Sequence, residues 1–178
     1  MGRCLYRRHR LADVRSDARL PENLGGLYLG GGYPELHAAR LAKNAAMRAA
    51  IRDFSAAGRP VFAECGGFMY LCERLRDLEG REYPMCGVFP RTCVMRPKLS
   101  ALGYREAVMP RKTFFGPAGT RLYGHEFHYS ELLPDPAETE PQQFMQRGDT
   151  LAGYLHLHWG RTPEAPAAFA RACRAAQP

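Results

Sequence analysis

Cys65 lies where a nucleophilic thiol could be held on a sharp turn. The apolar, β-favouring run 61–64 leads into it, and Gly66 and Gly67 follow. Ala63 and Gly67 match the small-x-nucleophile-x-Gly pattern of a nucleophile elbow, where larger neighbours would clash with a strained backbone. A helix that starts at the glycines would offer N–H groups and a positive dipole end to a thiolate or an oxyanion. A buried structural cysteine beside a Gly-rich turn explains the same residues, so both interpretations stay open.

A thiol nucleophile needs a base near neutral pH, and histidine suits that task. His125 and His128 share one predicted strand, and His156 and His158 share another. With a carboxylate, these two pairs could also hold zinc or iron. No H-E-x-x-H or C-x-x-C spacing supports that, so we predict no metal site. Two interpretations of these histidines remain. They are polar residues packed within the strands, or one of them is the base for Cys65.

The segments before Cys65 alternate in the manner of an α/β protein. The run 27–29 predicts a strand that ends in the glycine turn 30–32, and Pro34 begins a helix over about 34–42. Asn44 is predicted to cap a second helix that leads back to the strand 61–64. The residues on the apolar face of this second helix are Met47, Ala50, Ile51 and Phe54.

Strand, helices, strand, elbow and helix predict a parallel, doubly wound sheet. The helix after the elbow is expected to carry Phe68, Leu71, Cys72 and Leu75 on one face. Sites in such sheets gather at the carboxyl ends of strands, where both the glycine turn and Cys65 would fall.

The second half of the chain is predicted from shorter patterns. Segment 80–116 indicates short, antiparallel strands, and 131–149 indicates a polar surface loop with a turn at its Arg-Gly-Asp tripeptide. A strand over 122–130 would place Glu126, His128 and Ser130 on one face, and a strand over 151–159 would do the same for Tyr154, His156 and His158. A last helix is expected from Thr162-Pro163-Glu164 to about Ala175.

Composition suits one globular domain: 178 residues, of which 46% are hydrophobic and 24% charged. The formal net charge is +7, and residues 1–19 supply +4 of it, from six arginines less two aspartates. The basic excess therefore belongs mainly to a poorly patterned tail, and we interpret it as solvated charge and predict no nucleic-acid partner.

Several classes of protein find no support in the sequence. No apolar run approaches the roughly 20 residues of a membrane span, and no secretory signal is visible, so neither membrane nor export is predicted. Six cysteines without a C-x-x-C pair are then expected as free thiols in the cytoplasm. Neither a phosphate loop nor a dinucleotide fingerprint is present, so we expect no ATP site in this chain.

Five motifs in a fixed order resemble one family. They are LYLGGGYPELH at 27–37, AECGGFMYL at 63–71, GYRE at 103–106, GHEFHYS at 124–130 and YLHLH at 154–158. Together they closely resemble the C-terminal glutamine amidotransferase domain of the cobyrinate a,c-diamide synthases, which act in cobalamin (corrin) biosynthesis. The resemblance covers about residues 20–172. It places an amidotransferase-like domain at 20–178 behind a basic tail at 1–19.

The resemblance implies an α/β, flavodoxin-like doubly wound sheet of the class I glutamine amidotransferase type. Cys65 would attack the side-chain amide of glutamine and release ammonia through a thioester, with His156 as general base and acid. Backbone N–H groups of Gly66 and of Gly31 or Gly32 would form the oxyanion hole.

Further contacts follow from the same resemblance. Glu126 and His128 would lie near the active centre or a domain interface. Many amidotransferases of this fold carry His-x-Glu, in which the carboxylate orients the histidine, but the corresponding residue here is His158. His158 is one candidate to orient His156 or to contact substrate, and a Cys–His dyad oriented by some other group is the safer expectation.

In the family, ammonia passes to an N-terminal domain that uses ATP and Mg²⁺ to activate the a and c carboxylates of cobyrinate or hydrogenobyrinate. This sequence contains no such domain, and its Arg-rich tail does not resemble the strand–helix–strand unit that usually precedes the glycine turn. The resemblance therefore implies a domain truncated at its N-terminus, with no cofactor of its own. It could hydrolyse glutamine at most, and amidation of the corrin precursor would need a partner.

Other functions stay open on the sequence. One is a non-catalytic or split-gene remnant of the same enzyme, and another is the related synthase that amidates nickel-sirohydrochlorin. A different cysteine hydrolase on the same fold is a third, and an isolated metal-binding domain ranks last.

Overall fold

The computed structural model describes residues 14–15, 19–135 and 143–177. The predicted tail 1–19 lies mostly outside the described residues. The helices are α1 (Ala38–Lys43), α2 (Ala45–Ala56), α3 (Gly66–Leu71) and α4 (Glu164–Ala175), with a 3-10 turn, η1, at Pro34–His37. The strands are β1 (Leu27–Leu29), β2 (Val61–Glu64), β3 (Cys72–Arg76), β4 (Glu82–Pro84), β5 (Phe89–Met95), β6 (Ala101–Val108), β7 (Arg121–His128), β8 (Ser130–Leu132), β9 (Met145–Arg147), β10 (Thr150–Gly153) and β11 (His156–Leu157).

A parallel sheet of β1, β2 and β10, extended by antiparallel β9, forms the centre of the molecule. All four residues of β2 are buried, which explains the apolar run that marks this strand in the sequence. Val61 pairs with Leu27 on one side and with Thr150 on the other, so β2 is the inner strand. The predicted parallel sheet is confirmed, and its carboxyl end carries Cys65.

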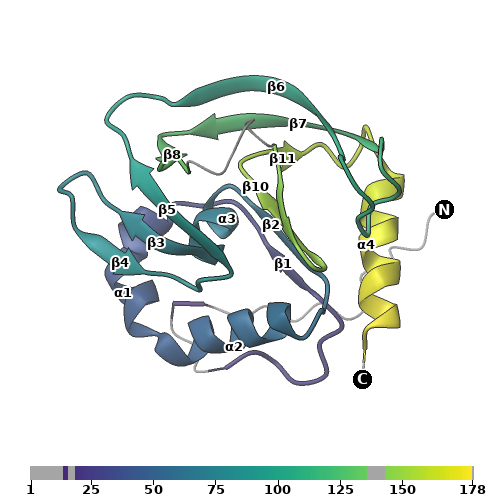
Figure 1. Ribbon diagram of the computed structural model, residues 1–178, viewed down its shortest axis with the longest axis horizontal. Coiled ribbons are helices and arrows are strands. Elements are labelled where there is room, and N and C mark those ends of the chain that lie inside the picture. The colour runs from purple at the N-terminus through teal and green to yellow at the C-terminus, as the bar shows by residue number, and fades with distance from the viewer. Residues whose placement is uncertain (1–13, 16–18, 136–142, 178) are drawn as a thin grey trace.

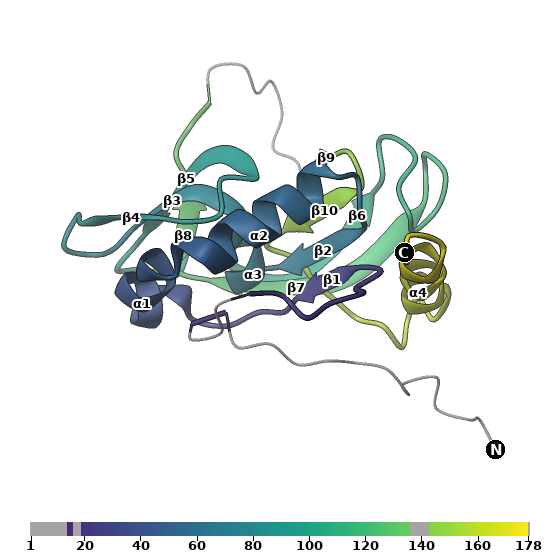
Figure 2. The ribbon, with the colours of Figure 1, turned by 90° about the horizontal axis from the view of Figure 1, so that it is seen from below.

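The two faces of this sheet pack against different layers, one that contains α2 and one that contains β7, β11 and α4. Val61 and Ala63 share a core with Met47 and Ile51 of α2. Phe62, between them in sequence, points the other way into a second core with side chains from β7, β10, β11 and α4. Figure 1 shows this order, with α2 below the sheet, β6 and β7 above it and α4 beside it, and Figure 2 shows α2 lying along the sheet.

Helix α2 forms where its cap and apolar spacing predict it. The Met47 N–H donates to Oδ1 of Asn44 at 3.3 Å, which satisfies one of the free donors of the first turn. Met47, Ile51 and Phe54 are buried. The predicted helix over 34–42 is also present, as η1 followed by α1.

The helix after the elbow is shorter than predicted. It ends at Leu71, and Cys72 is already extended as the first residue of β3. The N–H groups of Cys86 and Val88 donate to the carbonyls of Tyr70 and Leu71. The last carbonyls of the helix are therefore satisfied by a later segment of the chain. Strand β3 joins a second sheet of order β4-β3-β5-β8, and a register shift follows Cys72. Because of that shift Cys72 and Leu75, three residues apart, are both buried. A spacing of three is also typical of one face of a helix, which explains the wrong prediction.

The strand predicted over 151–159 is two strands in two sheets. Strand β10 ends at Gly153 in the parallel sheet, and β11 pairs antiparallel with β7 in a third sheet of order β11-β7-β6. The strand predicted over 122–130 likewise divides into β7 and β8. The predicted loop 131–149 contains part of β8 and all of β9, and its Gly148-Asp149 forms the tight turn into β10.

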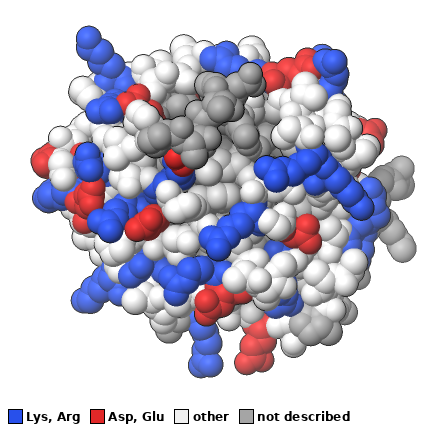
Figure 3. Space-filling model, in the orientation of Figure 1, with Lys and Arg blue, Asp and Glu red and all other residues white. Residues whose placement is uncertain are grey.

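Charges of both signs mix on the surface. Figure 3 shows acidic groups beside several of the basic ones on the face it presents. Arg76 with Glu82 and Arg81 with Asp77 are exposed ion pairs, at 2.6 Å and 2.8 Å. Within the described residues, no helix has the length and apolar character needed to cross a membrane.

Candidate active site

Cys65 sits on a strained turn between β2 and α3. Its backbone has φ +47° and ψ −106°. Among the described residues, Asn23 is the only other non-glycine residue with positive φ. Such a conformation costs about 1–3 kcal/mol and persists only where the surrounding fold imposes it. The Cys65 N–H donates to the carbonyl of Gly153 at 2.7 Å, which fixes the turn to the end of β10. The strand–turn–helix geometry predicted for Cys65 is thus present.

The glycines around the turn are needed because two backbones meet there. A Cβ on Gly66 would lie 2.5 Å from the carbonyl oxygen of Gly32, and a Cβ on Gly67 would overlap the carbonyl of Leu29. A Cβ on Gly31 would overlap Cε1 of the His156 ring and lie 3.2 Å from Nδ1. The fold therefore places Gly66 against Gly32, and Gly31 against the ring of His156.

The Cys65 thiol is buried, and burial raises its pKa to about 11. A hydrogen bond from the Gly66 N–H lowers it in part, while the carboxylates of Glu35 and Glu64 raise it further. Near neutral pH the side chain is therefore a thiol, so a base must take its proton when it attacks.

His156 projects from β11 opposite His125 of β7, and the two rings stack with centroids 5.0 Å apart. Its side chain is 25% exposed. Burial, followed by the charges of His125 and His128, lowers the pKa of His156 below its usual value. The imidazole is thus neutral near pH 7 and able to accept a proton. Within the described part of the chain, Cys65 and His156 share no hydrogen bond. Catalytic hydrogen bonds of this kind often form only once substrate is bound.

Glu64, the residue before Cys65, is a site residue that sequence reasoning missed. Its carboxylate is 5% exposed and lies 3.9 Å from His156, measured from Oε2 to Nδ1. Oε2 accepts the hydroxyl of Tyr28 at 2.7 Å, and Oε1 accepts the N–H of Leu157 at 2.8 Å. Burial raises the pKa of Glu64 and these two hydrogen bonds oppose the rise. The signal available in the sequence was a charged residue inside a strand that is otherwise apolar.

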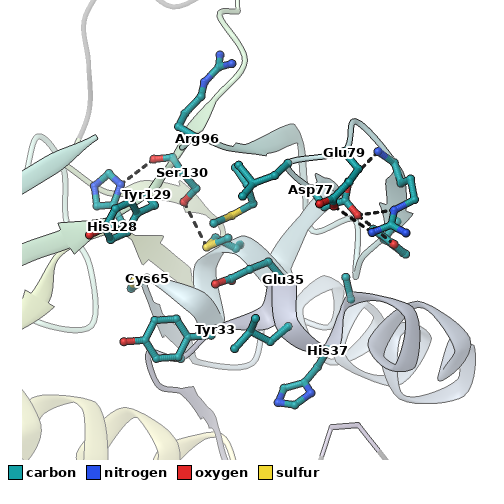
Figure 4. Close-up of a pocket in the computed structure, with 18 of the residues that line it drawn as sticks. Tyr33, Glu35, His37, Cys65, Asp77, Glu79, Arg96, His128, Tyr129 and Ser130 are labelled. Atoms are coloured by element: carbon teal, nitrogen blue, oxygen red, sulfur yellow. Dashed lines mark hydrogen bonds and ion pairs between the residues drawn. The ribbon is translucent and has the colours of Figure 1, made fainter. Parts of the chain in front are cut away.

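Cys65 opens onto a cavity of about 610 Å³. Figure 4 shows Cys65 at one side of it, with Glu35 pointing into the space and His128, Tyr129 and Ser130 on the facing strand segment. Burial raises the pKa of Glu35. The cavity is large enough for a free amino acid, with its side chain and its α-amino and α-carboxyl groups.

The remaining predicted site residues lie in different places. His128 lines the cavity, and its ring stacks on Tyr154 while Nδ1 is 2.7 Å from the Ser130 carbonyl. Glu126 does not line it and pairs with Arg105 at 3.2 Å. His158 is exposed, and its Nδ1 accepts the Arg161 N–H at 3.1 Å. Of the described residues, no three histidine, cysteine, aspartate or glutamate side chains lie together as a metal site would need.

Comparisons with known proteins identify the family of this chain. Residues 5–164 match the family model described as "CobB/CobQ-like glutamine amidotransferase domain". The chain is 42% identical over 169 residues to the cobyrinate a,c-diamide synthase of Dehalococcoides mccartyi strain 195, covering 87% of this chain and 36% of that protein. It is 39% identical over 172 residues to the enzyme of the same name from Leptospira interrogans (89% and 38%). It is 40% identical over 172 residues to the hydrogenobyrinate a,c-diamide synthase of Streptomyces coelicolor (91% and 34%). The chain thus spans little more than a third of the length of these curated relatives.

Solved structures show the same fold. A crystal structure titled as a glutamine amidotransferase superposes with a TM-score of 0.60 at 16% identity, covering 86% of this chain and 81% of the other. A putative GMP synthase component from Thermoplasma acidophilum superposes with a TM-score of 0.52 at 15% identity, covering 86% and 75%. Both likenesses concern fold alone, and they agree with the predicted class I amidotransferase architecture. The match along residues 5–164 shows that the chain belongs to the CobB/CobQ-like glutamine amidotransferase domain family.

Proposed function

We propose that this domain hydrolyses glutamine, with Cys65 as nucleophile and His156 as general base and acid. His156 takes the thiol proton as the Cys65 sulfur bonds to the amide carbon. It then gives that proton to the leaving nitrogen, so that the C–N bond breaks and ammonia departs. Water, deprotonated by His156, cleaves the resulting thioester and releases glutamate. The observation that carries the proposal is the strained Cys65 elbow at the edge of a cavity.

We also propose an oxyanion hole made by Gly66 and the glycine turn. The Gly66 N–H is close enough to the Cys65 thiol to lower its pKa, and Gly32 lies against Gly66. Backbone N–H groups from Gly66 and from Gly31 or Gly32 would then meet the negative charge that develops on the amide oxygen. Each such donor is worth roughly 3–4 kcal/mol in the transition state.

The ammonia would serve amidation of a corrin precursor. The relatives named above carry the names of cobyrinate and hydrogenobyrinate a,c-diamide synthases, and the a and c carboxylates of these compounds are the proposed acceptors. Activation of a carboxylate would need ATP and Mg²⁺, for which this sequence offers no phosphate loop. A synthetase domain outside this sequence is therefore the proposed partner, with the cytoplasm as the expected location.

The test is covalent trapping with 6-diazo-5-oxo-norleucine, a glutamine analogue. Mass spectrometry of the treated protein is expected to find one adduct, on the peptide that contains Cys65, and millimolar glutamine should prevent it. Cys173 is an internal control, because burial raises its pKa to about 11 as well. If labelling depended on thiol acidity alone, the analogue would react with both cysteines at similar rates. Labelling of Cys173 at the same rate, or no adduct on a protein that circular dichroism shows to be folded, would overturn the proposal and favour a non-catalytic remnant.

Gly31→Ala is expected to lower the rate of glutamine hydrolysis about 10²-fold, the cost of moving a catalytic group by about 1 Å. The added Cβ overlaps the His156 ring, which must therefore shift. Gly30→Ala is the matched control, because its Cβ would make only ordinary contacts, at 3.9 Å from the Tyr28 ring. Release of ammonia by the two variants is the measurement. Equal rates would show that the position of the His156 ring does not matter.

A further inference from the structure

We propose that Glu64 is the positioning residue for His156, and that Tyr28 and the Leu157 N–H hold its carboxylate in place. This rests on the proposed glutaminase function. The His-x-Glu arrangement of many amidotransferases of this fold is absent here, since His158 occupies that position and is turned to the Arg161 N–H. In this chain the carboxylate would come from the residue next to the nucleophile.

Strand geometry explains why Glu64 and Cys65, which are adjacent in sequence, point in different directions. Phe62 and Glu64 point to the same face of β2, toward the layer that contains β7 and β11. Cys65 follows at the turn and opens onto the cavity instead. Glu64 thus lies near His156, whereas Cys65 lines the cavity and Glu64 does not.

The hydrogen-bond partners of Glu64 favour a carboxylate, against the burial that raises its pKa. Its two contacts are both donors, the Tyr28 hydroxyl and the Leu157 N–H, and a carboxylate only accepts. Burial and Glu64 together raise the pKa of Tyr28, so its hydroxyl keeps the proton that it donates. A buried carboxylate is costly unless it is well bonded, and this one is bonded at both oxygens.

The contacts fix the backbone that carries His156 and place a carboxylate near its ring. Leu157 is the next residue of β11, so its bond to Oε1 sets the position of the strand that carries His156. Oε2 lies 3.9 Å from Nδ1, about 1 Å beyond a hydrogen bond, a gap that small ring movements can close. An Nδ1–H facing Glu64 leaves the Nε2 lone pair to act as the base, the tautomer that a Cys–His pair requires.

Glu64→Gln tests this role, because it keeps the shape and an acceptor for the Leu157 N–H. We expect kcat for glutamine hydrolysis to fall at least about tenfold while KM changes little, since Glu64 does not touch the cavity. The acid limb of kcat/KM should also move to lower pH, because a negative charge near His156 is lost while the charges of His125 and His128 remain. Glu64→Asp keeps the charge and should leave the acid limb closer to that of the unsubstituted protein.

Two controls separate this role from a structural one. Glu106→Gln removes an exposed carboxylate that pairs with Arg121 on the β6–β7 hairpin, and it should change neither kcat nor the pH profile. If Glu64→Gln fails to fold, nitrogen NMR of the histidine rings in the unsubstituted protein still decides. An Nδ1–H tautomer of His156 supports the proposal, and an Nε2–H tautomer overturns it.

The outcomes also separate the two proposals. Absence of trapping at Cys65 in the unsubstituted protein refutes the glutaminase function itself. Normal trapping and turnover, with an unchanged pH profile in Glu64→Gln, refute only the role of Glu64.

Discussion

Cys65→Ser is expected to lower the rate of glutamine hydrolysis roughly 10⁴-fold or more, on the scale found when the nucleophile of a catalytic unit is removed. A hydroxyl is a far weaker acid and a poorer nucleophile than a thiol, so transfer of its proton to His156 during attack is much harder. The measurement is release of ammonia and glutamate by the purified chain.

The fold should survive this change. Serine is close to cysteine in size and meets the same backbone demand at φ +47°. A thermal melt should therefore stay within a few degrees of that of the unsubstituted protein. Cys173→Ser is the matched control and should keep full activity, because Cys173 lies on α4, which contributes no residue to the cavity lining. Retention of more than a hundredth of the activity by Cys65→Ser would mean that another group is the nucleophile.

His156→Asn is expected to cost about 10²–10⁴-fold in kcat/KM, the usual contribution of a general base. His158→Asn is the control, because it removes an exposed histidine two residues away and should change the rate less than about twofold. Comparable losses in both variants would remove His156 from its proposed role.

The pH dependence follows from the direction of the His156 pKa. Its value in the folded protein lies below the usual 6.5, so activity should persist through neutral pH and fall only on an acid limb below that value. Stability has the same sign. As pH falls below 6.5, the unfolded chain binds a proton before His156 does, so the folded state loses stability. His156→Asn should reduce this loss, as melting curves at pH 7.5 and 5.5 would show.

Much of the fold could be predicted because local pattern and tertiary packing agree. Three of the four buried residues of β2 are apolar and indicate a strand, and the cap and spacing of α2 mark it as a helix. Prediction failed where a distant segment decides the outcome. Helix α3 ends because residues 86–88 take its last carbonyls, and nothing near Leu71 in sequence announces that. Likewise, the continuous pattern over 151–159 conceals the passage from one sheet to another after Gly153.

The candidate site shows the same division. Cys65 and its glycines could be found because an elbow needs small residues at fixed spacing, and motif order pointed to the family that the comparisons show. Glu64 was missed although it is a charge in an otherwise apolar strand, because its contact with Leu157, 93 positions away, cannot be read from the sequence. The catalytic roles of Cys65 and His156 stay predictions until the variants are measured.

Because the site is divided between two sheets, a movement of one sheet against the other would alter it. Cys65 ends a strand of the parallel sheet, whereas His156 belongs to the sheet of the β6–β7 hairpin. The outer side of that hairpin carries Leu102 and Tyr104, and Tyr104 is 90% exposed. A molecule that binds there and shifts the hairpin changes the separation of thiol and imidazole. If that molecule changes the stability of the Cys65 thioester by some factor, formation of the thioester must change the affinity of the hairpin for the molecule by the same factor.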